Sequence, residues 1–119
     1  MSLKDVVDRF ALVSGLSQKE ISRWIFIIID SIKYFENICK IDALKESDKK
    51  RLSYACAVYA YYKYSLTQSE LAHSFKAGDV QISESSSLID TASKLWQIQK
   101  NEISDIADFS DSCFVRVRT

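Results

Sequence analysis

The stretch ISRWIFIIIDSIKYF, residues 21–35, decides the fold class of this 119-residue chain. Its apolar side chains recur three or four residues apart, which is the spacing of one face of an α-helix. They are Ile21, Trp24, Ile25, Ile28, Ile32 and Phe35. The preceding residues SQKE, 17–20, have the form of a capping box, so a long helix is predicted to begin here. Ile27 and Ile29 widen the apolar face, so this helix either lies at the centre of the fold or meets another subunit.

The rest of the chain also favours helices, because it contains no proline and only two glycines, Gly15 and Gly78. Three further helices are predicted from capping residues and apolar spacing, with Ser47 or Asp48 as the cap of the middle one. They cover about residues 2–15, 47–65 and 87–107. We therefore predict a single all-α domain over residues 1–119, organised like a four-helix bundle.

Two segments break the helical pattern. Gly78 and Asp79 indicate a turn, after which residues 79–83 alternate apolar and polar side chains as a short extended piece does. The tail, residues 111–119, alternates Val115 and Val117 with arginines, which is the period of a half-exposed β-strand. A lone strand leaves its backbone groups unpaired, so we expect it to add to residues 79–83 or to a strand edge in a partner.

The predicted third helix is rich in tyrosine. Its tyrosines point in several directions around a helix, so some of them must face outward or face a partner. They are Tyr54, Tyr59, Tyr61, Tyr62 and Tyr64. Packing in a core and contact at an interface both explain them, because tyrosine joins a large apolar ring to a polar tip.

The charge balance argues against partners that are recognised by charge alone. The chain has 16 basic and 16 acidic residues, so no overall attraction draws it to nucleic acid or to an anionic membrane. The first residues contain no apolar signal stretch, and the most hydrophobic run, residues 24–29, is too short to span a membrane. A cytoplasmic location is expected.

Motifs that carry chemistry are missing from the sequence. His73 is the only histidine, and two isolated glycines cannot form a phosphate-binding loop. Cys39, Cys56 and Cys113 are too widely spaced for a metal-binding pair, so we expect buried, reduced thiols. We therefore expect no catalytic, cofactor-binding or metal-binding residues, and no enzymatic activity.

Two alternatives remain open. The stretch LTQSELAHSF, residues 66–75, has the form of the first helix of a helix-turn-helix DNA-binding regulator, capped at Thr67. Its sequel QISESSSLIDTA, residues 81–92, supplies mainly serines and acids where a recognition helix needs groups for phosphates and base edges. A generic helical interaction module, such as an antitoxin-like or scaffold protein, is the second alternative.

The second half of the chain resembles the small head-tail connector, or neck adaptor, proteins of tailed phages and prophages. The resemblance lies in the order of AVYAYYKYSL, SFKAGDVQISESSS and LIDTASKLWQ, residues 57–66, 74–87 and 88–97. In that family a helix with aromatic and alanine positions leads into a glycine-aspartate-valine turn with a serine-rich sequel. The corresponding places are held here by Gly78, Asp79, Val80, Ile82 and Ser83.

The resemblance implies a helical, non-enzymatic protomer that assembles into a ring under the portal of the capsid and joins head to tail. Its partners would be the portal protein and other neck or tail proteins, with DNA only as cargo passing through the ring. Assembly would take place in the bacterial cytoplasm, and the product would be part of the virion. We expect partner contacts in the turn and the terminal strand, at Gly78, Asp79, Val80, Ile82, Phe114, Val115, Arg116, Val117 and Arg118.

Overall fold

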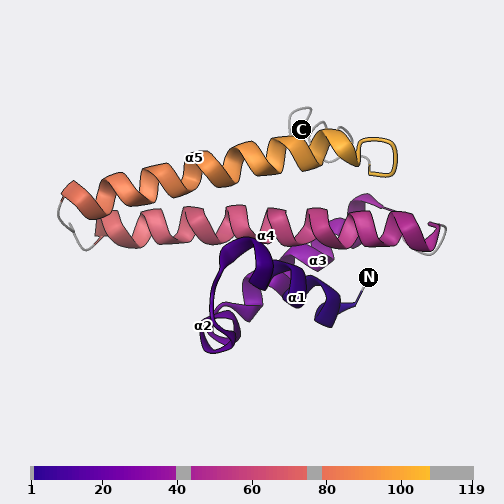
Figure 1. The fold of residues 1–119 in the computed structure, drawn as a ribbon, viewed down its shortest axis with the longest axis horizontal. Coiled ribbons are helices and arrows are strands. Elements are labelled where there is room, and N and C mark those ends of the chain that lie inside the picture. The colour runs from indigo at the N-terminus through magenta and orange to yellow at the C-terminus, as the bar shows by residue number, and fades with distance from the viewer. Residues whose placement is uncertain (1, 40–43, 75–78, 108–119) are drawn as a thin grey trace, which may run out of the picture.

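The computed structural model describes residues 2–39, 44–74 and 79–107. For residues 69–74 and 79–88 it describes the backbone, and for the others it also describes the environment of the side chains. The described residues form five helices and contain no strand, which confirms the all-α prediction (Figure 1). The helices are α1 Leu3–Ser14, α2 Gln18–Arg23, α3 Ile25–Ile38, α4 Glu46–Ser74 and α5 Asp79–Glu102. The predicted C-terminal strand lies outside the described residues.

Helix α1 begins and ends where the sequence predicts. The hydroxyl oxygen of Ser2 accepts a hydrogen bond from the backbone N–H of Asp5 at 3.2 Å, which caps the first turn. Gly15 follows the last turn with φ of 71°, a left-handed conformation that glycine adopts without steric cost. Val6 and Phe10 turn their side chains into the core.

The single helix predicted from residue 17 onward is two helices, because the backbone breaks at Trp24. Ser17 caps α2 as expected, accepting from the N–H of Glu20 at 3.3 Å. The N–H of Trp24 is shared between the carbonyls of Glu20 and Ile21, which ends α2 in a tighter turn. The Trp24 ring lies edge-on to Tyr64 of α4, with ring centroids 5.8 Å apart, and this contact accompanies the break.

Helix α4 is longer than predicted and runs to Ser74 instead of Ser65. No glycine or proline interrupts this stretch, so nothing in the backbone chemistry ends the helix earlier. The helix-turn-helix alternative has Thr67 as the cap of a separate helix, whereas in the structure Thr67 lies inside α4. Its hydroxyl donates to the carbonyl of Lys63, four residues back, at 3.1 Å, as a threonine inside a helix does.

Helix α5 corrects the prediction of an extended piece at residues 79–83. These residues form the first turns of α5, and the predicted cap Ser87 lies inside the helix. Two alternating apolar residues are too few to impose a strand without a partner strand beside them. At the other end the helix stops at Glu102, and the chain turns through hydrogen bonds from Ile106 and Ala107 to the carbonyl of Ile103.

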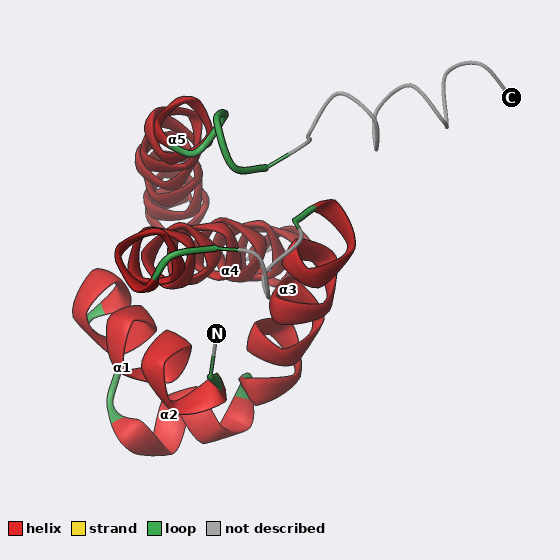
Figure 2. Ribbon diagram, turned by 90° about the vertical axis from the view of Figure 1, so that its right-hand side faces the viewer, coloured by secondary structure: helices red, strands yellow, loops and turns green. Residues whose placement is uncertain are grey.

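The helices form three layers rather than a bundle of four (Figure 2). The long helices α4 and α5 lie antiparallel as a hairpin, and α1 to α3 gather on the other side of α4 (Figures 1 and 2). The middle of α4, residues 52–61, is therefore buried on most sides, and its residues are mostly small. They include Ala55, Cys56, Ala57, Val58 and Ala60, none of which is exposed.

An aromatic cluster joins the three layers. Phe35 of α3 is fully buried, and its ring centroid lies 5.8 Å from that of Tyr59 on α4 and 6.0 Å from that of Trp96 on α5. Tyr59 and Trp96 also contact each other, with centroids 4.8 Å apart. One continuous core therefore holds α3, α4 and α5 together.

Candidate functional site

The residues that the sequence singles out for partner contacts fall into two groups. Asp79, Val80 and Ile82 lie in the first turns of α5, at the end of the hairpin where α4 and α5 are connected (Figure 1). The others lie outside the described residues, namely Gly78, Phe114, Val115, Arg116, Val117 and Arg118. The three described residues share one helix end.

The tyrosines of α4 serve mainly in packing. Tyr59 stacks on Tyr34 of α3 at a centroid distance of 4.8 Å and an interplanar angle of 19°. Tyr64 meets the edges of Phe10 and Trp24, and Tyr61 is buried. Of the two explanations open from the sequence, packing holds for these three rings, while Tyr54 remains on the surface.

An apolar surface is exposed on α3. Phe26 is 53% exposed and Ile29 is 38% exposed, whereas Ile27 and Ile28 between them are buried. The sequence showed that α3 is apolar nearly all round, and the structure shows which side stays uncovered. Asp30 and Lys33 are also exposed and share a helix face with Phe26 and Ile29. We call these four residues the α3 outer face.

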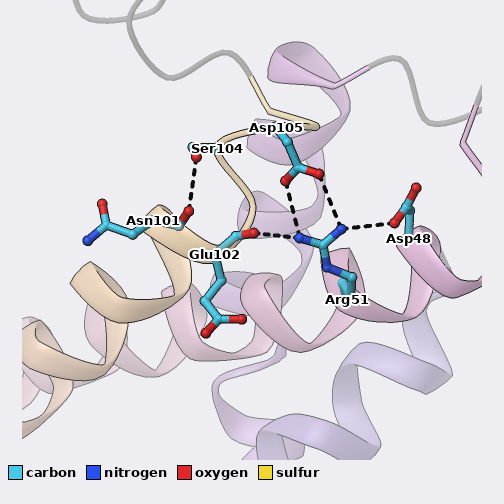
Figure 3. Close-up of polar contacts among 6 residues, drawn as sticks. All are labelled: Asp48, Arg51, Asn101, Glu102, Ser104 and Asp105. Carbon is cyan, nitrogen blue, oxygen red and sulfur yellow. Dashed lines mark hydrogen bonds and ion pairs between the residues drawn. The ribbon is translucent and has the colours of Figure 1, made fainter.

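An arginine clamp joins the start of α4 to the end of α5 (Figure 3). Arg51 donates from Nη1 to Asp48 Oδ1 at 2.9 Å and from Nη2 to Asp105 Oδ1 at 3.1 Å. Its Nη2 also donates to the carbonyl oxygen of Glu102, the last residue of α5. A cation at a helix C-terminus is favourable, because the terminal carbonyls carry partial negative charge.

The clamp shifts the proton affinities of its members in the expected directions. The hydrogen bonds that Arg51 donates to Asp105 and Asp48 raise the pKa of its guanidinium, which therefore stays charged. The hydrogen bond from Arg51 lowers the pKa of the Asp105 carboxyl, which therefore stays ionised to more acidic pH than a free aspartate. Sequence reasoning missed this pair because 54 residues separate its partners.

A cavity of about 450 Å³ opens beside the clamp. Helix α1 contributes Arg9 to its wall, and α4 contributes Lys50, Arg51 and Tyr54. Helix α5 completes the wall with Gln99, Glu102 and Ile103. Three basic residues and one acidic residue thus line a space large enough for a side chain or a small molecule.

The buried cysteines do not form a reactive centre. Cys39 and Cys56 are free and buried, as the sequence predicts. Burial raises the pKa of Cys39 to about 11, and it raises the pKa of Cys56 to about 12, so neither thiol is activated as a nucleophile.

Two further findings bear on the class of protein. Within the described ranges, no helix combines the length and apolar character needed to cross a membrane. No family model matches the sequence, and no curated protein and no solved structure matches it either.

Proposed function

We propose that this chain is a structural assembly protein that acts through contacts with other protein chains, and that it is a head-tail connector of the neck of a tailed phage or prophage. The observation that carries the first part is the α3 outer face. The second part rests on the sequence resemblance in residues 57–97.

Single exposed apolar residues are normal on a protein surface and do not by themselves indicate an interface. The α3 outer face differs because its apolar side chains lie next to each other. Phe26 and Ile29 are one turn apart, and the ring of Phe26 lies 5.9 Å from that of Trp24. The charged side chains Asp30 and Lys33 flank this apolar pair. An aromatic centre with a polar border is the composition of a protein interface.

The position of the hairpin supports the assignment to the phage neck. The end where α4 and α5 are connected extends past α1 to α3, so it is the tip of the molecule (Figure 1). The resemblance assigns Asp79, Val80 and Ile82 at this tip to contacts with a partner. A protruding helical hairpin suits an adaptor, because it can reach a neighbouring chain without disturbing the core.

The test is co-purification with the portal protein that the connector assignment requires to be encoded near this chain. Phe26→Ser should reduce the amount of portal protein recovered at least tenfold, because a central interface aromatic commonly contributes more than about 1.4 kcal/mol. Ile98→Ser is the matched control, since Ile98 is a similarly exposed apolar residue, at 55%, on the outer side of α5.

Deleting residues 114–119 tests the terminal segment separately. We expect the helical circular dichroism spectrum to persist while portal binding is lost.

Equal recovery of portal protein with Phe26→Ser and Ile98→Ser would remove the α3 outer face from the proposal. Failure of the unaltered chain to bind any neck or portal protein would remove the connector assignment.

A further inference from the structure

We propose that the cavity beside the arginine clamp binds the carboxylate of an aspartate or glutamate side chain presented by another protein. The inference does not depend on the proposed connector function, because it uses neither the α3 outer face nor the resemblance. It rests on the lining of the cavity and on the pairing of its charges.

The two unpaired cations of the cavity are the first argument. Arg9 and Lys50 both line it, and neither forms an ion pair within the described part of the chain. They come from different helices, α1 and α4, so the fold brings them to one space from distant points in the sequence. Two such cations can hold one carboxylate between them through charge-assisted hydrogen bonds.

Part of the cavity wall is fixed in place. Arg51 is held by Asp48, Asp105 and the Glu102 carbonyl, so its guanidinium is already occupied and serves as structure. Ile103 is almost fully buried at the cavity and gives it an apolar side. This part of the wall therefore needs no rearrangement on binding, and only Arg9 and Lys50 lose side-chain freedom when a ligand enters.

Neutral and polar groups complete the site. Tyr54 and Gln99 both belong to the lining, and a hydroxyl and a side-chain amide are groups that can donate hydrogen bonds to an oxygen ligand. Lys50 is exposed, so the cavity is open to the surface at that point, and a side chain of another protein can enter there.

The local charge favours a carboxylate over phosphate groups. The three cations Arg9, Lys50 and Arg51 are matched by three carboxylates, those of Asp48, Glu102 and Asp105. A polyanion such as nucleic acid therefore meets no net positive field here, and the Glu102 side chain repels a dianionic phosphate more than a single carboxylate.

The experiment is a titration of the full ¹⁵N-labelled chain with a capped peptide that contains a single glutamate among neutral residues, followed by backbone amide shifts in NMR spectra at constant ionic strength. Shift changes should centre on Arg9, Lys50, Tyr54 and Gln99. In the double variant Arg9→Gln, Lys50→Gln the dissociation constant should rise about five- to tenfold, as expected for the loss of two partly exposed ionic contacts. The control is Lys4→Gln, Lys19→Gln, which removes the same charge at exposed positions outside the cavity and outside the α3 outer face.

Three parallel titrations distinguish the sources of the anion. Sodium glutamate at equal carboxylate concentration should bind more weakly than the peptide, and equal binding would point to a free small acid instead. Inorganic phosphate or a short DNA duplex that shifts the same amides at lower concentration would overturn the choice of carboxylate.

Shift changes on peptide binding that are the same in both double variants would refute the assignment of the peptide to this cavity. Phe26→Ser should bind the peptide normally, so this result is separable from the portal test.

Discussion

Replacing Phe35 by alanine tests whether α3, α4 and α5 share one core. The Phe35 ring is fully buried and contacts the rings of Tyr34, Tyr59 and Trp96. Truncating a buried phenylalanine to alanine costs about 3–5 kcal/mol, because apolar burial is lost and a cavity remains. A domain of this kind is stable by about 5–15 kcal/mol in total, so the change removes a large part of its free energy of unfolding.

Phe26→Ala is the matched control, since it makes the same substitution in the same helix at a half-exposed site. It loses the contact with Trp24 but leaves no buried cavity, so we expect a cost of about 1 kcal/mol or less. At roughly 4 °C per kcal/mol for a chain of this length, the melting temperature should fall about 12–20 °C for Phe35→Ala and no more than about 4 °C for Phe26→Ala.

The assay is urea unfolding followed by circular dichroism and by tryptophan fluorescence. The sequence has a second tryptophan, Trp24, so the measurement uses a Trp24→Phe background in which fluorescence from Trp96 reports on α5. Coincident curves from the two probes would then show that α5 unfolds together with the rest of the domain. A loss below about 1.5 kcal/mol in Phe35→Ala, or a loss equal to that of Phe26→Ala, would refute the shared aromatic core.

Three other predictions follow from local features. The hydrogen bond from Arg51 lowers the pKa of Asp105, so the ionised Asp105 stabilises the fold fully above its unfolded-state pKa of about 4, and this stabilisation is lost as pH falls through the lowered pKa. Urea unfolding at several acidic pH values should show the loss. In Arg51→Gln this pH dependence should disappear. In a Cys113→Ser variant, Ellman's reagent at pH 8 should modify Cys39 and Cys56 only after urea is added. The reason is that pH 8 lies three units or more below their pKa values of about 11 and 12, so both thiols stay protonated in the folded protein. Rapid modification of the folded protein would contradict their burial. Gly15→Ala should cost about 1 kcal/mol in urea unfolding because φ is positive there, while Gly15→Asn should cost less.

The parts of the fold that depend on neighbouring residues could be predicted from the sequence. The caps at Ser2 and Ser17 and the stop at Gly15 involve residues within four positions of each other, and all three are confirmed. The burial of Cys39 and Cys56 was likewise predicted from composition and spacing. The caps and the stop need no knowledge of how the helices pack, whereas the burial of the two thiols was expected because a free cysteine behaves as a small apolar residue.

The parts that depend on packing could not be predicted in the same way. The break at Trp24 accompanies the contact of its ring with Tyr64, 40 residues further along the chain. Asp79 and its neighbours carry an alternating pattern that favours a strand, but the backbone there is helical, facing α4 in the hairpin. The cavity combines Arg9 with Lys50 and Gln99, and no local pattern marks three such distant residues as one site.

The central position of α4 has a consequence for the order in which the protein folds. Helices α1 and α3 pack on one side of α4 and α5 packs on the other, so both docking steps use the same template. A template that two steps share must be formed before either of them is complete. Changes in the small residues of α4, such as Ala57 and Val58, should therefore slow folding itself, whereas changes in α5 such as Trp96→Ala should mainly speed unfolding.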